Sequence, residues 1–157
     1  MENNDDILKK FLKLNFYYSY KYNKNKNDYD VFITIPKGRK YFVWIKDDEK
    51  YYYFFEHDTF NNIIKKGKHI KTLKINHFGL EKGTLLFGTL FEYKNTKFYN
   101  IEDIFYYKNK YIYNKTFIKK LLILEKVLDI IDNTTICFGL PIITSTQILR
   151  RDSGHVL

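Results

Sequence analysis

Residues 84–103 read TLLFGTLFEYKNTKFYNIED, and this stretch decides the fold class. Apolar, aromatic and β-branched residues fill both of its halves, and such residues favour strands. The turn-like Lys94-Asn95-Thr96 between the halves predicts a hairpin of two strands, Thr84–Tyr93 and Lys97–Asp103. Strands joined by a short turn pair antiparallel, so the stretch predicts an antiparallel sheet.

More strands are predicted on both sides of this hairpin. The aromatic-rich first third of the chain and the segment after it favour strands near Phe16–Tyr22, Tyr29–Ile35, Lys40–Lys46, Lys50–Glu56 and Ile70–Asn76. The acidic turn Asp47-Asp48-Glu49 closes a second hairpin, and the asparagine- and lysine-rich residues 23–28 are typical of a solvated loop. A last strand is predicted at Thr134–Leu140.

Helices are few in this sequence and flank the strands. In chain order the predicted helices are Asp6–Leu14, a short one from Asp58 or Thr59 to Lys66, Lys115–Ile131 and a short one near Thr144–Arg151. Asp5 or Asp6 is suited to cap the first. Because strands dominate and are joined by hairpins, we expect an α+β fold of antiparallel sheets with peripheral helices.

Length and composition favour one globular domain over residues 1–157. No apolar run reaches the roughly 18 residues that a membrane span needs, so no membrane partner is expected. Residues 1–6 are acidic and contain neither a basic leader nor an apolar signal core. The lone Cys137 fits a reducing compartment, so we expect the nucleus or the cytoplasm, or both.

The formal net charge of +9 suggests a polyanion partner, but it does not decide the question alone. The chain has 27 basic residues, of which only Arg39, Arg150 and Arg151 are arginines, and it has no alanine. Lysine, asparagine, isoleucine, tyrosine and phenylalanine abound, as in proteins of AT-rich genomes. Part of the lysine and aromatic content therefore reflects codon composition.

Residue types that carry catalytic or metal chemistry are sparse. No metal-ligand spacing relates the four histidines, His57, His69, His77 and His155. No Ser-His-Asp arrangement and no phosphate loop is present. Trp44, the only tryptophan, lies in a predicted strand and is expected in the core.

Four short segments carry a resemblance to a known superfamily. In order they are Ile35-Pro36-Lys37-Gly38-Arg39-Lys40, LFGTL at 86–90, FYNIEDIFYY at 98–107 and Ser153-Gly154-His155-Val156. Their order and spacing resemble motifs K-x-D-G-x-R, D-G-E, F-x-x-F-D and D/E-G-L-V of the covalent nucleotidyltransferases, which include mRNA guanylyltransferases and ATP-dependent ligases. The resemblance spans roughly residues 12–157. It implies a nucleotidyltransferase-like (ATP-grasp-like) fold, truncated after the fourth motif.

The chain departs from this superfamily at the positions that perform catalysis. Gly38 and Lys40 match the glycine and the arginine of the first motif. The replacements are Ile35 for the nucleophilic lysine, Lys37 for its aspartate, Phe87 and Thr89 for the acids of D-G-E, and Ser153 for the acid of the last motif. A covalent nucleotidyl intermediate needs an amine nucleophile and acids that hold a metal. The resemblance therefore implies a fold without catalytic residues, metal or cofactor.

Within the superfamily, Pro36–Lys40 and Cys137–Leu140 are similar to the cap-binding domain of snurportin, which is non-catalytic and reads an RNA cap. This likeness implies that the chain binds an RNA 5′ cap or a guanine nucleotide. Aromatic side chains would stack on the base and cations would hold the phosphates. The candidate ligand-binding residues are Leu14, Asn15, Tyr17, Tyr18, Lys37, Arg39, Lys40, Lys50, Phe87 and Thr89.

Several alternatives stay open at this point. Tyr17 and Tyr18 are either stacking residues or ordinary strand aromatics, and Phe87 either lines the nucleotide pocket or fills it. For the whole chain, the preferred hypothesis is a catalytically inactive domain that binds an RNA cap or 5′ end. One alternative is a structural subunit with a protein partner in an RNA-processing or transcription assembly. Another is a divergent but active capping enzyme or ligase.

Overall fold

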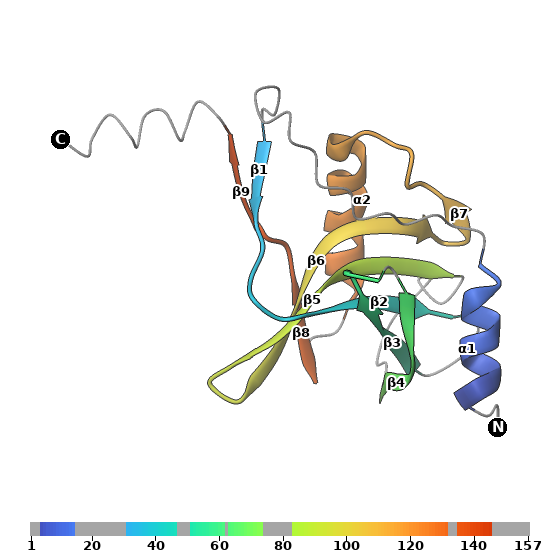
Figure 1. The fold of residues 1–157 in the computed structure, drawn as a ribbon. Coiled ribbons are helices and arrows are strands. Elements are labelled where there is room, and N and C mark those ends of the chain that lie inside the picture. The colour runs from blue at the N-terminus through green and yellow to red at the C-terminus, as the bar shows by residue number, and fades with distance from the viewer. Residues whose placement is uncertain are drawn as a thin grey trace.

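The computed structural model describes residues 4–14, 31–46, 51–61, 63–73, 83–131 and 135–145. Its elements are α1 (Asn4–Leu12), β1 (Val31–Thr34), β2 (Arg39–Ile45), β3 (Tyr51–Asp58), β4 (Ile63–Leu73), β5 (Thr84–Tyr93), β6 (Thr96–Tyr107), β7 (Lys110–Tyr111), α2 (Phe117–Ile130), β8 (Ile136–Gly139) and β9 (Ile142–Ser145). A seven-stranded sheet has the order β4-β3-β2-β5-β6-β7, with β8 beside β6, and β1 and β9 form a separate pair (Figure 1). The α+β class is confirmed.

Nearly all strand pairs are antiparallel, as the sequence predicts. The exception is β8, which runs parallel to β6 and pairs Lys97 with Ile136. Two parallel strands need a crossover connection between them, and α2 lies in the connection from β6 to β8. Figure 1 shows that the turn end of the β5–β6 hairpin extends beyond the other strands of the sheet as a long arm.

The central strand β2 explains why the sheet has two cores. Its residues 41–45 are all buried, because both faces of the sheet are covered. Phe42 and Trp44 belong to one apolar cluster, while Tyr41, Val43 and Ile45 belong to the other. Trp44 is 6% exposed, so its expected place in the core is confirmed.

Helix α1 covers the first of these faces. Ile7, Leu8 and Phe11 are buried in one cluster with Phe42 and Trp44, and the Phe11 ring stacks on the Phe55 ring at 4.1 Å. The helix begins at Asn4, two residues before the predicted start. Asp5 and Asp6 therefore lie in its first turn, where negative charge opposes the helix dipole favourably, and are not its cap.

Helix α2 covers the opposite face, with Leu124 and Val127 buried against the second cluster. Thr116 is its N-cap, and the hydroxyl oxygen accepts a hydrogen bond from the backbone N–H of Lys119. The predicted helix at Lys115–Ile131 is confirmed, since the observed helix begins two residues later and ends one residue earlier.

The hairpin that decided the fold class forms as expected. β5 has its predicted bounds, and the turn consists of Lys94 and Asn95, both with positive φ. Such turns match the right-handed twist of the strands. Thr96 already belongs to β6, which continues to Tyr107 and is longer than predicted.

Two predicted helices are wrong. Asp58 does not begin a helix: its carboxylate accepts bonds from the backbone N–H groups of Phe60 and Asn61 and closes a turn, after which β4 begins. Thr144 is likewise in a strand, β9, which pairs with β1. The rest of that predicted helix, and the predicted strand Phe16–Tyr22, lie outside the described residues.

Candidate nucleotide-binding groove

The groove begins at Gly38, in the connection between β1 and β2. A Cβ atom at Gly38 would lie 2.4 Å from the carbonyl oxygen of Leu90 and 2.7 Å from Cγ2 of Thr89. Only glycine therefore lets this connection lie directly against β5. Because Gly38 lies so close to β5, its neighbours Lys37 and Arg39 are held next to the arm formed by β5 and β6.

An open groove of about 350 Å³ lies where this connection meets the arm. Its lining residues are Lys37, Gly38, Arg39, Tyr41, Leu90, Phe91, Glu92 and Lys97. This volume is at the lower end of the range of small-molecule sites. The lining combines apolar and aromatic residues with charged ones, which is the composition that a nucleotide site requires.

Three cations and one exposed acid set the charge of the groove. Lys37, Arg39 and Lys97 are exposed, and so is Glu92, which lies opposite Lys97 in the β5–β6 register. The Arg39 guanidinium lies 4.0 Å from the buried carboxylate of Glu56, with its side chain 70% exposed. Because most of the Arg39 side chain is exposed, its guanidinium is accessible to an anionic ligand in the groove.

The chain was also compared with known proteins. Neither a protein-family model nor a curated protein sequence matches it. The chemistry of the groove and of the side chains around it is therefore the basis for a function.

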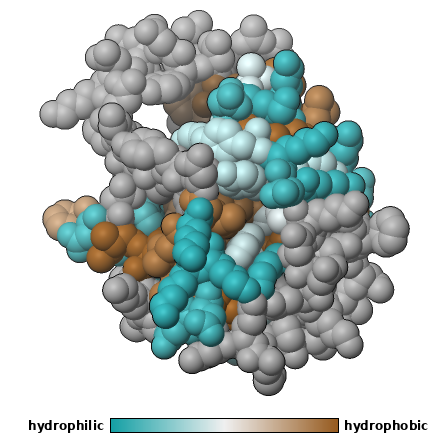
Figure 2. Space-filling model, turned by 90° about the vertical axis from the view of Figure 1, so that its right-hand side faces the viewer, coloured by the Kyte–Doolittle hydropathy of each residue, from teal (hydrophilic) through white to brown (hydrophobic). Residues whose placement is uncertain are grey.

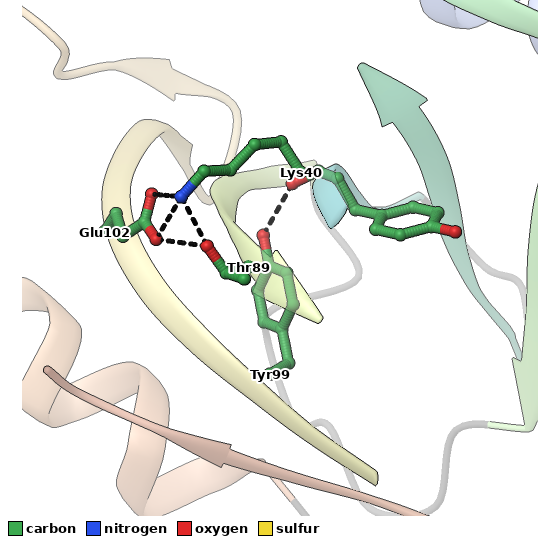
Figure 3. A network of polar contacts seen from close by, with 5 residues as sticks. Lys40, Thr89, Tyr99 and Glu102 are labelled. Carbon is green, nitrogen blue, oxygen red and sulfur yellow. Dashed lines mark hydrogen bonds and ion pairs between the residues drawn. The ribbon is translucent and has the colours of Figure 1, made fainter. Parts of the chain in front are cut away.

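A buried polar network joins side chains of β2, β5 and β6 next to the groove residue Arg39 (Figure 3). The Lys40 ammonium donates to both carboxylate oxygens of Glu102, at 2.7 and 2.9 Å, and to the hydroxyl of Thr89. The Thr89 hydroxyl in turn donates to Glu102. The side chains of Lys40 and Glu102 are only 17% and 7% exposed, so the network is an internal ion pair.

Strand register brings these three residues together. Lys40 on β2 lies opposite Thr89 on β5, and Thr89 lies opposite Asn100 on β6. The β5–β6 register shifts between Phe87 and Gly88, which leaves Glu102 as the extra residue of a bulge. A bulge redirects side chains, and here it directs Glu102 toward Thr89 and Lys40.

Several of the candidate ligand-binding residues lie in the buried polar network or in the apolar core and do not line the groove. Lys40 is neutralised by Glu102 and lies on the face away from the groove. Phe87 is 3% exposed and packs against Phe42 and His57, while Thr89 is fully buried. Phe87 therefore belongs to the apolar core. Leu14 is half-buried against the same apolar cluster.

Of the ten candidate residues, the structure thus brings two together in the groove, Lys37 and Arg39. Asn15, Tyr17, Tyr18 and Lys50 lie outside the described residues. Sequence reasoning missed Lys97 as a groove residue. The predicted hairpin contained the necessary signal, because antiparallel pairing places Lys97 beside Glu92 and near the basic connection at 37–39.

Two further observations concern membranes and metals. None of the helices in the described ranges is long and apolar enough to cross a bilayer. Within the same ranges, no group of three or more histidine, cysteine, aspartate or glutamate residues is arranged to hold a metal ion.

Proposed function

We propose that this chain is a non-catalytic, nucleotidyltransferase-like domain that binds an RNA cap or an RNA 5′ end in the groove beside Gly38. The observation that carries the proposal is an open, basic groove at the segment that resembles the family's first motif. Lys37 and Arg39 lie in that segment, and Lys97 joins them from β6. Cations of this kind neutralise the phosphates of a 5′ end.

The groove also supplies the apolar part of such a site. Tyr41 and Phe91 are its aromatic members, and Leu90 adds an aliphatic one. Aromatic side chains stack on nucleotide bases of any kind, because every base presents a π face. A cap or a 5′-terminal nucleotide combines a flat base with several phosphates, so it matches the groove in both respects.

Replacing both Lys37 and Arg39 by glutamine is expected to weaken cap-analogue binding about 100-fold or more. Each hydrogen bond to a charged group is worth about 1.5–3 kcal/mol, and the variant removes two cations from the phosphate position. For the wild type, saturable binding with a Kd of roughly 100 µM or tighter is expected, about −5.5 kcal/mol. Isothermal titration calorimetry with a cap analogue, GTP and a 5′-triphosphate RNA measures these values.

The matched control for this experiment is Lys9→Gln with Lys13→Gln, which removes the same charge from exposed positions at α1. This control should bind like the wild type at equal ionic strength. The proposal is wrong if none of the three ligands binds saturably, or if the groove variant and the control variant bind equally well.

A second experiment addresses catalysis. Incubation with radiolabelled GTP or ATP and a divalent cation is expected to leave no label on the denatured protein. The reason is that Ile35, at the position of the nucleophilic lysine, carries no amine, and that Lys40 is engaged by Glu102. A covalent adduct, released by acid and absent after Lys37→Gln or Lys40→Gln, would instead favour a divergent capping enzyme or ligase.

A scaffold role is the second candidate, and an exposed apolar row on α2 favours it. Ile118 and Leu122 are 69% and 55% exposed, and they lie one turn apart on the same helical face. Apolar side chains that share an exposed face are typical of contact with another protein. Under this alternative, the groove binds no cap analogue and the chain acts as a subunit of an RNA-processing assembly.

A further inference from the structure

A second basic and aromatic surface lies at the other end of β6 from the groove. It is formed by the β6–β7 turn, β7, the connection after it and the first turn of α2, and we call it the tyrosine–lysine surface. Its residues are Lys108, Lys110, Tyr111, Tyr113, Lys115 and Lys119. Figure 2 faces the side of the molecule on which β7 lies, and its upper half shows pale, weakly hydrophilic side chains bordered by strongly hydrophilic ones.

The aromatic part of this surface is rigid and partly exposed. Tyr111 is 43% exposed, and its ring contacts the ring of Tyr106 at 5.3 Å and that of Tyr113 at 6.4 Å. Tyr113 in turn stacks on Phe105, with ring planes only 2° apart at 4.5 Å. Because neighbouring rings already hold Tyr111, a base that stacks on it meets a side chain with little freedom left to lose.

The backbone supports this rigidity. Lys108 and Asn109 form a tight turn with positive φ at both residues, and the Asn109 N–H donates to the Gly83 carbonyl at 2.9 Å. The turn places Tyr111 opposite Tyr106 in the β6–β7 register. Exposed Lys108, in the turn, and exposed Lys110, directly after it, therefore lie next to the aromatic residues.

The charges around these rings are almost all positive. Lys120 forms an ion pair with Asp103 at 2.9 Å, and its ammonium lies 4.3 Å from the centre of the Tyr113 ring. Among the residues that the structure describes, no acid pairs with Lys108, Lys110, Lys115 or Lys119. The first turn of α2 contains no acidic residue, so the positive end of its dipole adds to the same potential.

The phenol groups add no negative charge at neutral pH. Burial, followed by the charges of Asp103 and Tyr111, raises the pKa of Tyr113. Burial, followed by Tyr111, likewise raises the pKa of Tyr106. Both side chains therefore stay neutral, and their hydroxyl groups remain available as hydrogen-bond donors.

We infer that the tyrosine–lysine surface binds single-stranded RNA, with Tyr111 stacking on a base and the lysines holding the backbone. Single strands suit it better than duplexes, because an exposed ring needs an unstacked base and spaced lysines track a flexible backbone. The surface lies roughly 30 Å from the groove, given about ten residues of β6 at 3.3 Å each. The choice of RNA rests on the proposed function of the groove, but the surface carries its own chemistry.

Fluorescence anisotropy with a labelled 12-nucleotide RNA tests this inference. The RNA carries a 5′ hydroxyl, so it offers no cap or terminal phosphate to the groove. Tyr111→Ala is expected to weaken binding roughly 5- to 100-fold, the effect of losing one base–aromatic stack. Lys108→Gln with Lys110→Gln should lower the slope of log K against log salt by about 1.4, which corresponds to two phosphate contacts on a single strand.

Matched controls exist for both variants. Tyr93→Ala removes a tyrosine that is 61% exposed at the far end of the β5–β6 arm, and Lys9→Gln with Lys13→Gln removes two other exposed charges. Both controls should bind like the wild type. The inference is overturned if Tyr111→Ala behaves like Tyr93→Ala, if duplex RNA of the same sequence binds more tightly, or if the protein binds anionic vesicles but not this RNA.

The same experiment separates the two sites. Lys37→Gln with Arg39→Gln should leave binding of the 5′-hydroxyl RNA unchanged, because the groove does not take part. Loss of RNA binding in that variant would place the RNA in the groove and overturn the second surface. Cap-analogue binding that survives Tyr111→Ala, together with unaltered RNA binding, would retain the proposed function and reject the inference alone.

Discussion

Replacing Glu102 by leucine is expected to lower the free energy of unfolding by about 3–5 kcal/mol, because it leaves the Lys40 ammonium buried without its counter-charge. Lys40 is 17% exposed and its other partner, the Thr89 hydroxyl, is neutral. Urea denaturation followed by Trp44 fluorescence measures the change, since Trp44 is the only tryptophan and lies in the core beside α1.

A double-mutant cycle distinguishes the charge effect from lost packing. Lys40→Met combined with Glu102→Leu should recover most of the loss, because no charge is then buried. The double variant should still be about 1–3 kcal/mol less stable than the wild type, because the Thr89 hydroxyl loses both of its hydrogen-bond partners. Glu125→Leu, at an exposed site on α2, is the control and should change stability by less than about 0.5 kcal/mol. If the loss of stability in the double variant equals the sum of the losses in Lys40→Met and Glu102→Leu, the two side chains are not energetically coupled.

The sequence predicts the elements whose signal is local. β2, β3 and β5 are found within a few residues, because strands covered on both faces appear as continuous apolar and aromatic runs. Helix α2 is found because its apolar residues recur at helical spacing and Thr116 is a strong cap. These features depend on neighbours along the chain, so single-sequence reasoning reaches them.

The two wrongly predicted helices share a different physical cause. Asp58 is suited both to cap a helix and to close a turn, and the choice depends on β4 finding β3 as a partner. β1 and β9 stabilise each other across most of the chain, so neither segment alone indicates the pairing that excludes a helix at Thr144. Where local propensity allows both a helix and a strand or turn, long-range strand pairing of this kind decides which one forms.

The candidate site was predicted in part for the same reason. Lys37 and Arg39 adjoin Gly38, so a local motif was enough to indicate them. Lys40, only one residue further along, faces the opposite side of the sheet because side chains alternate along a strand. Its partner Glu102 could not be foreseen, since the bulge that directs it toward Lys40 exists only once β5 and β6 are paired.

Gly88→Ala is expected to lower the free energy of unfolding by about 3 kcal/mol, for a reason independent of any ligand. A Cβ atom there would lie 2.0 Å from the Asn100 carbonyl oxygen and 2.9 Å from its carbon. Both are backbone atoms of β6, so no side-chain rotation relieves the overlap and the two strands have to separate. Chemical denaturation of the variant measures the loss.

Gly139→Ala is the matched control, because a Cβ atom at Gly139, on the neighbouring strand β8, meets nothing within 4 Å. Its stability should lie within about 1 kcal/mol of the wild type or rise slightly. The folded fraction of Gly88→Ala should still bind cap analogue, because Gly88 does not line the groove. Unchanged stability together with lost cap binding would contradict this assignment and place the ligand at Gly88. Gly88 would then be required for a ligand, whereas the close approach of β5 to β6 assigns it to strand packing.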